Sequence, residues 1–286
     1  MSKFDERNVV IALKGYTAYF DASVDAEKRI PDISTVVAGF ISSVELWERW
    51  EADWRIALAK FDVPYFHMKE FTACKKAYKD AKWRSEPYRA RFLSTLVEIT
   101  NSLTLLSIAT STRRSLFDYQ NLFFRFDERF NPYVLSGVKC ALEAQDFVRR
   151  TLKSDLPIAY IFDRGDEGWP MLVREMENSG LPSPIRKHSR PDPKIDNPPA
   201  IQLQACDLLA WELRRGKLDG LKAKKRRRSL QALILFPSRK KWFEIYNDAL
   251  VELIKIAKIP IREGMEAPSE YVSCSLRPTK DGELKQ

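Results

Sequence analysis

Short apolar segments alternate with longer amphipathic segments along this chain, and this alternation restricts its fold more than any other sequence feature. Apolar stretches of strand length occupy residues 14–20, 35–41, 103–110 and 157–162, and residues 185–188 could add an edge strand. Helical periodicity begins near residue 42 and returns over residues 86–101, 132–150, 169–179, 200–215 and 241–258. Two strands thus come first and helices separate the later ones, so we expect an α/β fold in which a mixed sheet is flanked by helices.

Local signals mark where several of these helices begin and end. Ser42 and Glu45 have the spacing of a capping box, which predicts the start of the first long helix. Ser85 is expected to cap the helix that follows it. Because glycine after a helical stretch is typical of a helix end, we expect Gly180 and Gly216 to end theirs.

The 286 residues are enough for one large domain with a core of its own. We assign residues 1–215 to that domain, and residues 216–286 to a basic linker, a C-terminal helix and a loose tail that pack on it. The motifs G-x-G-x-x-G, G-x-x-x-x-G-K and G-x-S-x-G do not occur. Their absence disfavours dinucleotide-binding, P-loop and α/β-hydrolase proteins.

No segment has the length and apolar character of a transmembrane helix or a signal peptide. The longest stretch without a charge, residues 99–112, is shorter than the roughly 20 apolar residues that span a bilayer and contains Ser and Thr. The four cysteines lie far apart along the chain, which favours neither a disulfide framework nor a zinc site. We therefore expect a soluble protein of the reducing cytoplasm that does not bind a membrane.

The positive charge of the chain is concentrated in one segment. Residues 214–228 contain nine basic residues and one acid, and so carry nearly all of the net charge of +9. Such a segment attracts polyanions, so we expect nucleic acid as the partner. The expected contacts are Lys224, Lys225, Arg226, Arg227 and Arg228. The alternative is a basic loop that is only solvated.

Two aspartates stand where predicted strands end. Asp21 follows Tyr19 and Phe20, and Asp163 follows an apolar segment in the same way. Carboxylates at the ends of neighbouring strands can converge within reach of the same metal ion. For Asp21, the alternative is an ordinary turn residue.

Asp207 is the only charged residue between residues 200 and 211, in a helix that is otherwise apolar on nearly all sides. An ionised carboxylate buried without a partner would cost several kcal/mol, so Asp207 needs a cation, hydrogen-bond donors or a raised pKa. A metal ligand or an active-site acid meets this need. The alternative is a structural aspartate that is paired with Gln204, one turn earlier, or with an arginine.

Four parts of the sequence resemble a known family: Tyr19-x-Asp21-x-Ser23, residues 66–71 (Phe-His-Met-Lys-Glu-Phe), the strand-ending Asp163, and residues 201–212 (Ile-Gln-Leu-Gln-Ala-Cys-Asp-Leu-Leu-Ala-Trp-Glu). These residues look like the bacterial domain-of-unknown-function 3800 family, which is grouped with the ribonuclease H-like superfamily. The resemblance covers roughly residues 16 to 215, and its late helix is the most specific part. It implies a ribonuclease H-like mixed sheet, here with a basic helical C-terminal extension.

The resemblance also implies the site. Matched position by position, Asp21, Asp163 and Asp207 become carboxylates that bind Mg²⁺ or Mn²⁺, and Glu70 or His67 becomes a fourth contributor. The sequence departs from the family at the glutamate and glycine that follow the first aspartate, which are Ala22 and Val24 here. Nearby polar residues that could also reach the site are Asp25, Asp166, Glu167 and His188, although exposed loop positions explain them as well.

Together, the carboxylates and the basic segment predict a metal-dependent nuclease that hydrolyses phosphodiester bonds of DNA or RNA. Asp21, Asp163, Asp207 and Glu70 are its predicted catalytic residues. Two alternatives stay open: a nucleic-acid-binding protein of the same fold that has lost turnover, and a protein-interaction module in which the acids are structural.

Overall fold

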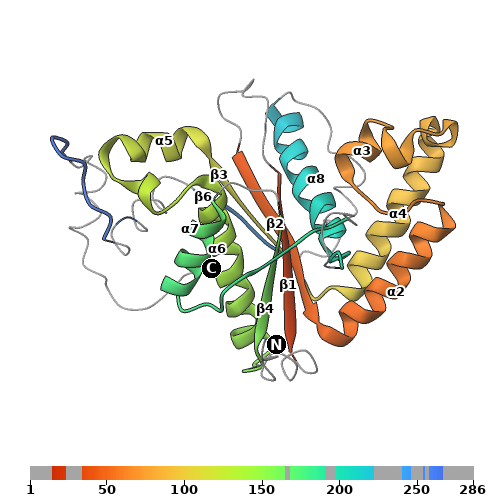
Figure 1. Cartoon of the computed structure of the whole chain (residues 1–286), viewed down its shortest axis with the longest axis horizontal. Coiled ribbons are helices and arrows are strands. Elements are labelled where there is room, and N and C mark those ends of the chain that lie inside the picture. Colours follow the sequence, from red (N-terminus) through yellow and green to blue (C-terminus); the bar gives the residue numbers. More distant parts are fainter. Residues whose placement is uncertain are drawn as a thin grey trace, which may run out of the picture.

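A computed structural model of the chain describes residues 15–23, 34–164, 168–190, 198–221, 240–245, 254 and 258–266. Within these residues, a six-stranded sheet forms the centre of the molecule, in the order β5-β4-β1-β2-β3-β6 (Figure 1). Its strands are β1 (Tyr16–Ser23), β2 (Ser34–Ser43), β3 (Leu106–Arg113), β4 (Ile158–Asp163), β5 (Ile185–Lys187) and β6 (Lys240–Ile245).

Strand β1 lies inside the sheet and has neighbours of both directions. It pairs antiparallel with β2, where Phe20 lies opposite Gly39, and parallel with β4, where Phe20 lies beside Phe162. Strand β3 continues the antiparallel pairing on β2, whereas β5 continues the parallel pairing on β4. The predicted fold class, an α/β protein with a mixed sheet flanked by helices, is confirmed. Strand β6 pairs in parallel with β3, so the sheet contains antiparallel and parallel pairs.

Helices cover both faces of this sheet (Figure 1). On one face lie α6 (Pro132–Asp146) and α7 (Trp169–Asn178). On the other lies α8 (Leu203–Leu221), with α2 (Val44–Lys60) and α4 (Glu86–Leu103) beyond it. The shorter elements are α3 (Met68–Thr72), α5 (Arg114–Phe123), η1 (Lys76–Tyr78), η2 (Ala81–Arg84), η3 (Phe126–Glu128) and η4 (Phe147–Thr151). Helix α5 has no counterpart among the elements predicted from the sequence.

Alternation along the strands divides the apolar residues between two cores. Phe20, Val37 and Ile108 pack into the core under α6, whereas Val36 and Ala38 pack into the core under α8. Successive side chains of a strand point to opposite faces, so β2 and β3 contribute to both layers. The position of a residue in its strand therefore determines which helices it meets.

The core under α8 is unusually rich in aromatic residues, and it fixes the helices beyond α8. The rings of Trp50 and Trp54 are stacked with centroids 4.4 Å apart. The indole of Trp47 donates a hydrogen bond of 2.8 Å to the carbonyl of Thr17, which attaches α2 to β1. The aromatic residues of the predicted first helix thus serve in the core.

Two predicted helix boundaries are wrong in detail. Ser43, not Ser42, caps α2: its hydroxyl accepts a 3.3 Å hydrogen bond from the N–H of Leu46, while the buried Ser42 donates to the carbonyl of Leu103. Helix α8 does not end at Gly216 but continues to Leu221. One glycine costs a helix only about 1 kcal/mol relative to alanine, which need not end it.

The predicted helix over residues 241–258 is wrong at its beginning. Residues 240–245 form β6, which pairs in parallel with β3, and Trp242 packs on the core under α8. Pairing with the edge of β3 outweighs the weak helical periodicity of this segment, a long-range effect that local sequence does not reveal. Residues 240–245 of the predicted extension therefore belong to the sheet, whereas residue 254 is helical.

We predict that Gly39→Ala strongly destabilises the fold, because a Cβ at this position would lie 1.8 Å from the carbonyl oxygen of Tyr19. This oxygen belongs to the backbone of β1, which cannot move without breaking the pairing with β2. We expect the free energy of unfolding, measured with urea, to fall by about 3 kcal/mol or more.

Gly137→Ala is the matched control for this substitution. A Cβ on Gly137 would meet only the side-chain atoms of Leu172 and Phe162, at 3.1 and 3.3 Å. The gain in helix propensity, about 1 kcal/mol, should offset the small adjustment of those side chains. Equal effects of the two substitutions would contradict the close approach of β1 and β2.

Candidate active site

The first two predicted acids lie on neighbouring strands and on the same face of the sheet. Phe20 of β1 lies beside Phe162 of β4, so Asp21 and Asp163 are the next residues on these two parallel strands. Both phenylalanines belong to the core under α6. Because side chains alternate, Asp21 and Asp163 face the opposite side of the sheet, which is covered by α8.

Helix α8 brings the third predicted acid to this face. The thiol of Cys206 donates a 3.2 Å hydrogen bond to the carbonyl of Tyr19, two residues before Asp21. Farther along the helix, Nε of Arg214 donates a 2.8 Å hydrogen bond to the hydroxyl of Ser23 at the end of β1. Helix α8 therefore lies along the end of β1, with Asp207 directly after Cys206.

Hydrogen bonds orient each of the three carboxylates. Asp207 Oδ2 accepts a 2.6 Å hydrogen bond from the N–H of Met68, the first residue of α3. Asp163 accepts from the N–H of Arg164 at 2.8 Å and from the hydroxyl of Ser189 at 3.3 Å. Asp21 accepts from the N–H of the following residue at 2.7 Å. All three acids are only partly buried, so they stand at the border between the core and solvent.

The charges of the three aspartates act on the same buried thiol. Burial raises the pKa of the Cys206 thiol, and the charges of Asp21, Asp163 and Asp207 all raise it further. Burial also raises the pKa of Asp163. It raises the pKa of Asp207 to about 7, with a further contribution from the charge of Asp163. Acids with raised pKa values next to one another are typical of functional sites, since they favour a bound cation or a shared proton.

The donor set fits Mg²⁺ or Mn²⁺ in kind, because both ions prefer oxygen ligands such as carboxylates. The positions of these carboxylates fit such an ion less well. Within the part of the chain that the structure describes, no group of three or more His, Cys, Asp or Glu side chains is arranged so that it could hold a metal ion. The three aspartates lie on the same side of the sheet, on β1, β4 and α8, and their side chains would have to rotate to bring their oxygens together on an ion.

Glu70, the predicted fourth contributor, is already surrounded by donors. Its Oε1 accepts hydrogen bonds from Lys76 Nζ at 2.9 Å and from Arg190 Nη1 at 2.7 Å, and its Oε2 accepts one from the hydroxyl of Tyr65 at 2.7 Å. Burial alone would raise the pKa of Glu70, but hydrogen bonds from Lys76 and Tyr65 outweigh it, so this pKa is lowered. The catalytic role of Glu70 stays a prediction.

His67 lies next to this cluster, with Nδ1 3.4 Å from Glu70 Oε1. Burial and the positive charge of Arg190 lower the pKa of His67 to about 4, so its imidazole is neutral at pH 7. His188 lies near Asp163: its Nε2 is 3.1 Å from Nη1 of Arg164, the residue after Asp163.

Sequence reasoning missed the residue that holds this site together. Gln204 does not pair with Asp207; its Oε1 accepts hydrogen bonds from the indole of Trp54 and from the N–H of Phe66, each at 2.9 Å. Its Nε2 donates a third bond, also 2.9 Å, to the carbonyl of Ser189. The available signal was a second polar residue, three positions before Asp207, in a helix that is otherwise apolar.

Several predicted residues lie outside the described part of the chain. They are the basic residues Lys224, Lys225, Arg226, Arg227 and Arg228 and the acids Asp25, Asp166 and Glu167. Among the described helices, none is long and apolar enough to cross a membrane.

Comparisons with known proteins give a remote structural likeness. No protein-family model matches the chain, and no curated protein matches it. The sequence resemblance to the domain-of-unknown-function 3800 family therefore stays a prediction. Among solved structures, the chain is similar to one from Archaeoglobus fulgidus, described as the PCNA:RNase HII complex, with a TM-score of 0.36 and 17% identity. The match covers 88% of this chain and 96% of that chain. At this level of similarity we take the function from the residues of the chain itself.

We predict that Gln204→Leu destabilises the protein, because it leaves two buried N–H groups and one carbonyl without their partner. Each such group costs about 1–3 kcal/mol, so the free energy of unfolding should fall by at least 3 kcal/mol. Trp54 fluorescence should report the loss of its indole hydrogen bond. The control is Gln202→Leu, which removes a single bond to Glu51 and should cost about 1 kcal/mol. Equal losses would show that Gln204 has no special structural role.

A second prediction concerns Asp207→Asn, whose carbonyl oxygen can still accept from Met68. The folded-state pKa of Asp207 is raised from 3.8 to about 7, so the folded protein binds its proton more tightly than the unfolded chain. The free energy of unfolding contributed by this group therefore falls as the pH rises from about 4 to about 7. Asparagine does not titrate, so at pH 8 and without metal the variant should be more stable than the wild type by about 1–3 kcal/mol.

Thermal melts of both proteins between pH 4 and pH 8 test this. The difference in stability between the variant and the wild type should shrink as the pH falls toward 4. Asp53→Asn, on the exposed side of α2, is the control and should change little across the range. A variant that is less stable than the wild type at pH 8 would mean that the charge of Asp207 is satisfied in the fold.

Proposed function

We propose that this chain is a metal-dependent nuclease that hydrolyses phosphodiester bonds of DNA or RNA. The observation that carries the proposal is the placement of Asp21, Asp163 and Asp207. They come from the ends of two adjacent parallel strands and from the helix that covers them, and their charges converge on the buried thiol of Cys206. Carboxylates gathered in this way have little structural benefit, because each raises the cost of ionising its neighbours.

In this proposal, Asp21, Asp163 and Asp207 would hold one or two Mg²⁺ or Mn²⁺ ions. Once bound, such ions supply an activated water and stabilise the charge on the leaving oxygen. The chain itself orients the ligands: the N–H of Met68 fixes one oxygen of Asp207, and Ser189 and Arg164 fix Asp163. No side chain has to act as a nucleophile.

The basic segment would hold the flanking nucleic-acid backbone. It begins along α8, the helix that carries Asp207, and residues 222–228 follow directly after Leu221. With a rise of about 1.5 Å per residue, Leu221 lies about 21 Å along the helix axis from Asp207. A short oligonucleotide could therefore reach from the three aspartates to the basic segment. Lys224, Lys225, Arg226, Arg227 and Arg228 are the proposed contacts, and they would bind the backbone without reading its sequence.

A second candidate function is nucleic-acid binding without turnover. Ala22 stands where the resembled family has a glutamate, so one carboxylate beside Asp21 is missing. The absence of a ready-made three-ligand group among the described side chains points the same way. A protein-interaction module, the third alternative, would need neither metal nor nucleic acid.

The test measures cleavage of labelled single-stranded DNA, duplex DNA, RNA and an RNA–DNA hybrid with Mg²⁺, with Mn²⁺ and with EDTA. We expect metal-dependent cleavage that falls at least about 100-fold, equivalent to about 2.7 kcal/mol, in each of Asp21→Asn, Asp163→Asn and Asp207→Asn. Asp118→Asn is the control, since its carboxylate pairs only with Arg114 on the surface of α5 in the contacts described.

Calorimetric titration with Mn²⁺ separates the alternatives. Binding of Mn²⁺ and nucleic acid without cleavage would favour the inactive relative. No Mn²⁺ binding, or cleavage that survives all three substitutions, would overturn the proposed site.

A further inference from the structure

Two positive side chains share one buried carboxylate oxygen beside the proposed site. Oε1 of Glu70 accepts from Lys76 at 2.9 Å and from Arg190 at 2.7 Å. The side chain of Glu70 is only 8% exposed, whereas those of Lys76 and Arg190 are 66% and 38% exposed. The buried glutamate therefore holds two cations together at the surface, and the charges of these three side chains sum to +1.

The surroundings of this pair add to the positive charge. The guanidinium carbon of Arg190 lies 5.8 Å from the ring centroid of Tyr65, which limits where its planar group can point. Arg190, Lys76 and Lys69 all lower the pKa of His67, after burial, although Glu70 raises it. His67 thus experiences a net positive potential contributed by three cations from separate segments.

The chain geometry shows that Lys76 is held at a cost. Its backbone has a φ of 52°, and Cys74, two residues earlier, has a φ of 50°, both in the left-handed region that residues other than glycine seldom adopt. Such conformations cost free energy and persist where the surrounding structure fixes them. Here the tight turn before η1 directs the lysine back toward Glu70.

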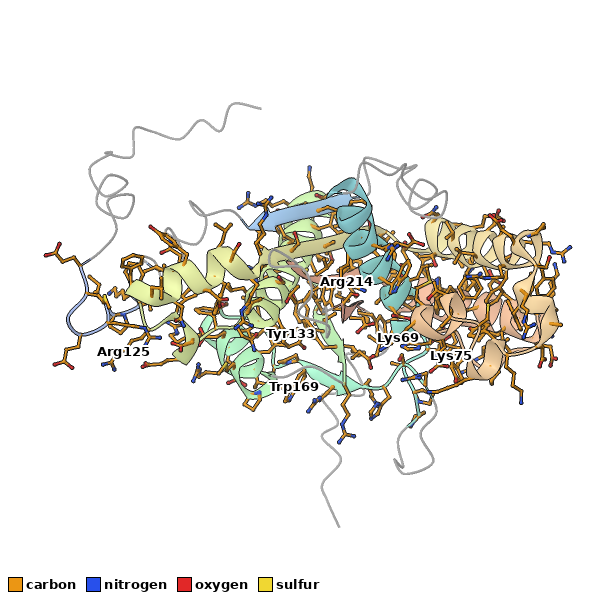
Figure 2. All side chains as sticks on the ribbon, turned by 90° about the horizontal axis from the view of Figure 1, so that it is seen from above. Lys69, Lys75, Arg125, Tyr133, Trp169 and Arg214 are labelled. Carbon is orange, nitrogen blue, oxygen red and sulfur yellow. The ribbon has the colours of Figure 1, made fainter. Side chains whose placement is uncertain are left out.

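This cation pair lies near two of the three acids, Asp163 and Asp207. Arg190 follows Ser189, whose hydroxyl donates to Asp163, and α3 begins at Met68, whose N–H donates to Asp207. The charge of Arg190 also lowers the pKa of Asp207, against the larger effect of burial. Figure 2 shows Lys69 and Lys75 on the side of α8 that carries α3, with Trp169 on the other side of the sheet.

We propose that Lys76 and Arg190 form a phosphate-binding subsite, which holds a backbone phosphate next to the one that is cleaved. The proposal rests on the nuclease function, and it answers a difficulty of that function, since three carboxylates repel the polyanion that they must approach. Arginine and lysine at close range to the acids would compensate this repulsion locally, and arginine can bind a phosphate through two N–H groups. In this subsite Glu70 is a positioning residue, which holds the two cations but does not touch the phosphate.

The experiment measures binding of a labelled single-stranded oligonucleotide by fluorescence anisotropy, in EDTA, over a series of salt concentrations. Lys76→Gln and Arg190→Gln should each weaken binding at low salt and reduce the log–log salt slope by about 0.7 for the lost contact. The charge-conserving variants Lys76→Arg and Arg190→Lys should retain most of the affinity. Thermal melts confirm that each variant is folded.

Lys139→Gln is the matched control. Lys139 also pairs with a largely buried glutamate, Glu143, at 2.6 Å, and Lys241 approaches the same residue at 3.1 Å. This second pair belongs to α6, on the other face of the sheet, so its removal should leave affinity and salt slope unchanged.

The outcomes separate this subsite from the nuclease function. Weaker binding in Lys76→Gln and Arg190→Gln supports the subsite even if the wild type shows no cleavage. In an active protein, the same substitutions should raise KM much more than they lower kcat. If the affinity and salt slope of both variants equal those of Lys139→Gln, the subsite proposal is overturned, whether or not the wild type cleaves nucleic acid.

Discussion

The side-chain amide of Gln204 is the interaction on which the arrangement of the site depends. It joins α8 to α2 through Trp54, to the segment before α3 through Phe66, and to the segment after β5 through Ser189. One turn later along α8, Asp207 makes a similar contact, because its carboxylate accepts a hydrogen bond from the N–H of Met68. In an extended segment the N–H groups of alternate residues point the same way, so those of residues 66 and 68 both point toward α8. On α8, residues 204 and 207 are three apart and therefore lie on the same face of the helix. Two side chains of one helix thereby fix the chain that leads to Glu70 and the chain that leads to Arg190.

Charge is the second constraint, because the site consists of a negatively charged region and a positively charged region. Burial raises the pKa of Asp163, and burial together with the charge of Asp163 raises the pKa of Asp207 to about 7. Around Glu70 the opposite holds, since Lys76, Tyr65 and Arg190 donate to its carboxylate and its pKa is lowered. Arg190 lies between the two regions. An acidic centre beside a basic margin is the charge pattern expected of a surface that binds a phosphodiester and coordinates a cation at the same time.

Much of this architecture follows from local sequence. Short apolar segments predicted the strands that carry Asp21 and Asp163, although β1 continues past Asp21 to Ser23, and the single charge in an apolar helix singled out Asp207. The features that could not be predicted depend on partners far away in the chain. Gln204 bonds to Phe66, 138 residues earlier, and β6 pairs with β3, more than 100 residues before it. The choice between Ser42 and Ser43 as the cap of α2 was equally open, because either serine has the required hydroxyl and only the distant hydrogen bond from Ser42 to the carbonyl of Leu103 separates them. The metal-binding and nucleic-acid-binding roles stay predictions.

The central claim is that Asp21, Asp163 and Asp207 belong to one cation site. Crystals soaked in Mn²⁺ and measured at the manganese absorption edge test it most directly, because the anomalous signal locates the ion independently of any assay of activity. The account predicts an anomalous peak at the ends of β1 and β4 under α8, with an oxygen of each aspartate at about the 2.1 Å of a hard-cation ligand bond. An occupied peak elsewhere, or carboxylates that stay apart at saturating Mn²⁺, would contradict it.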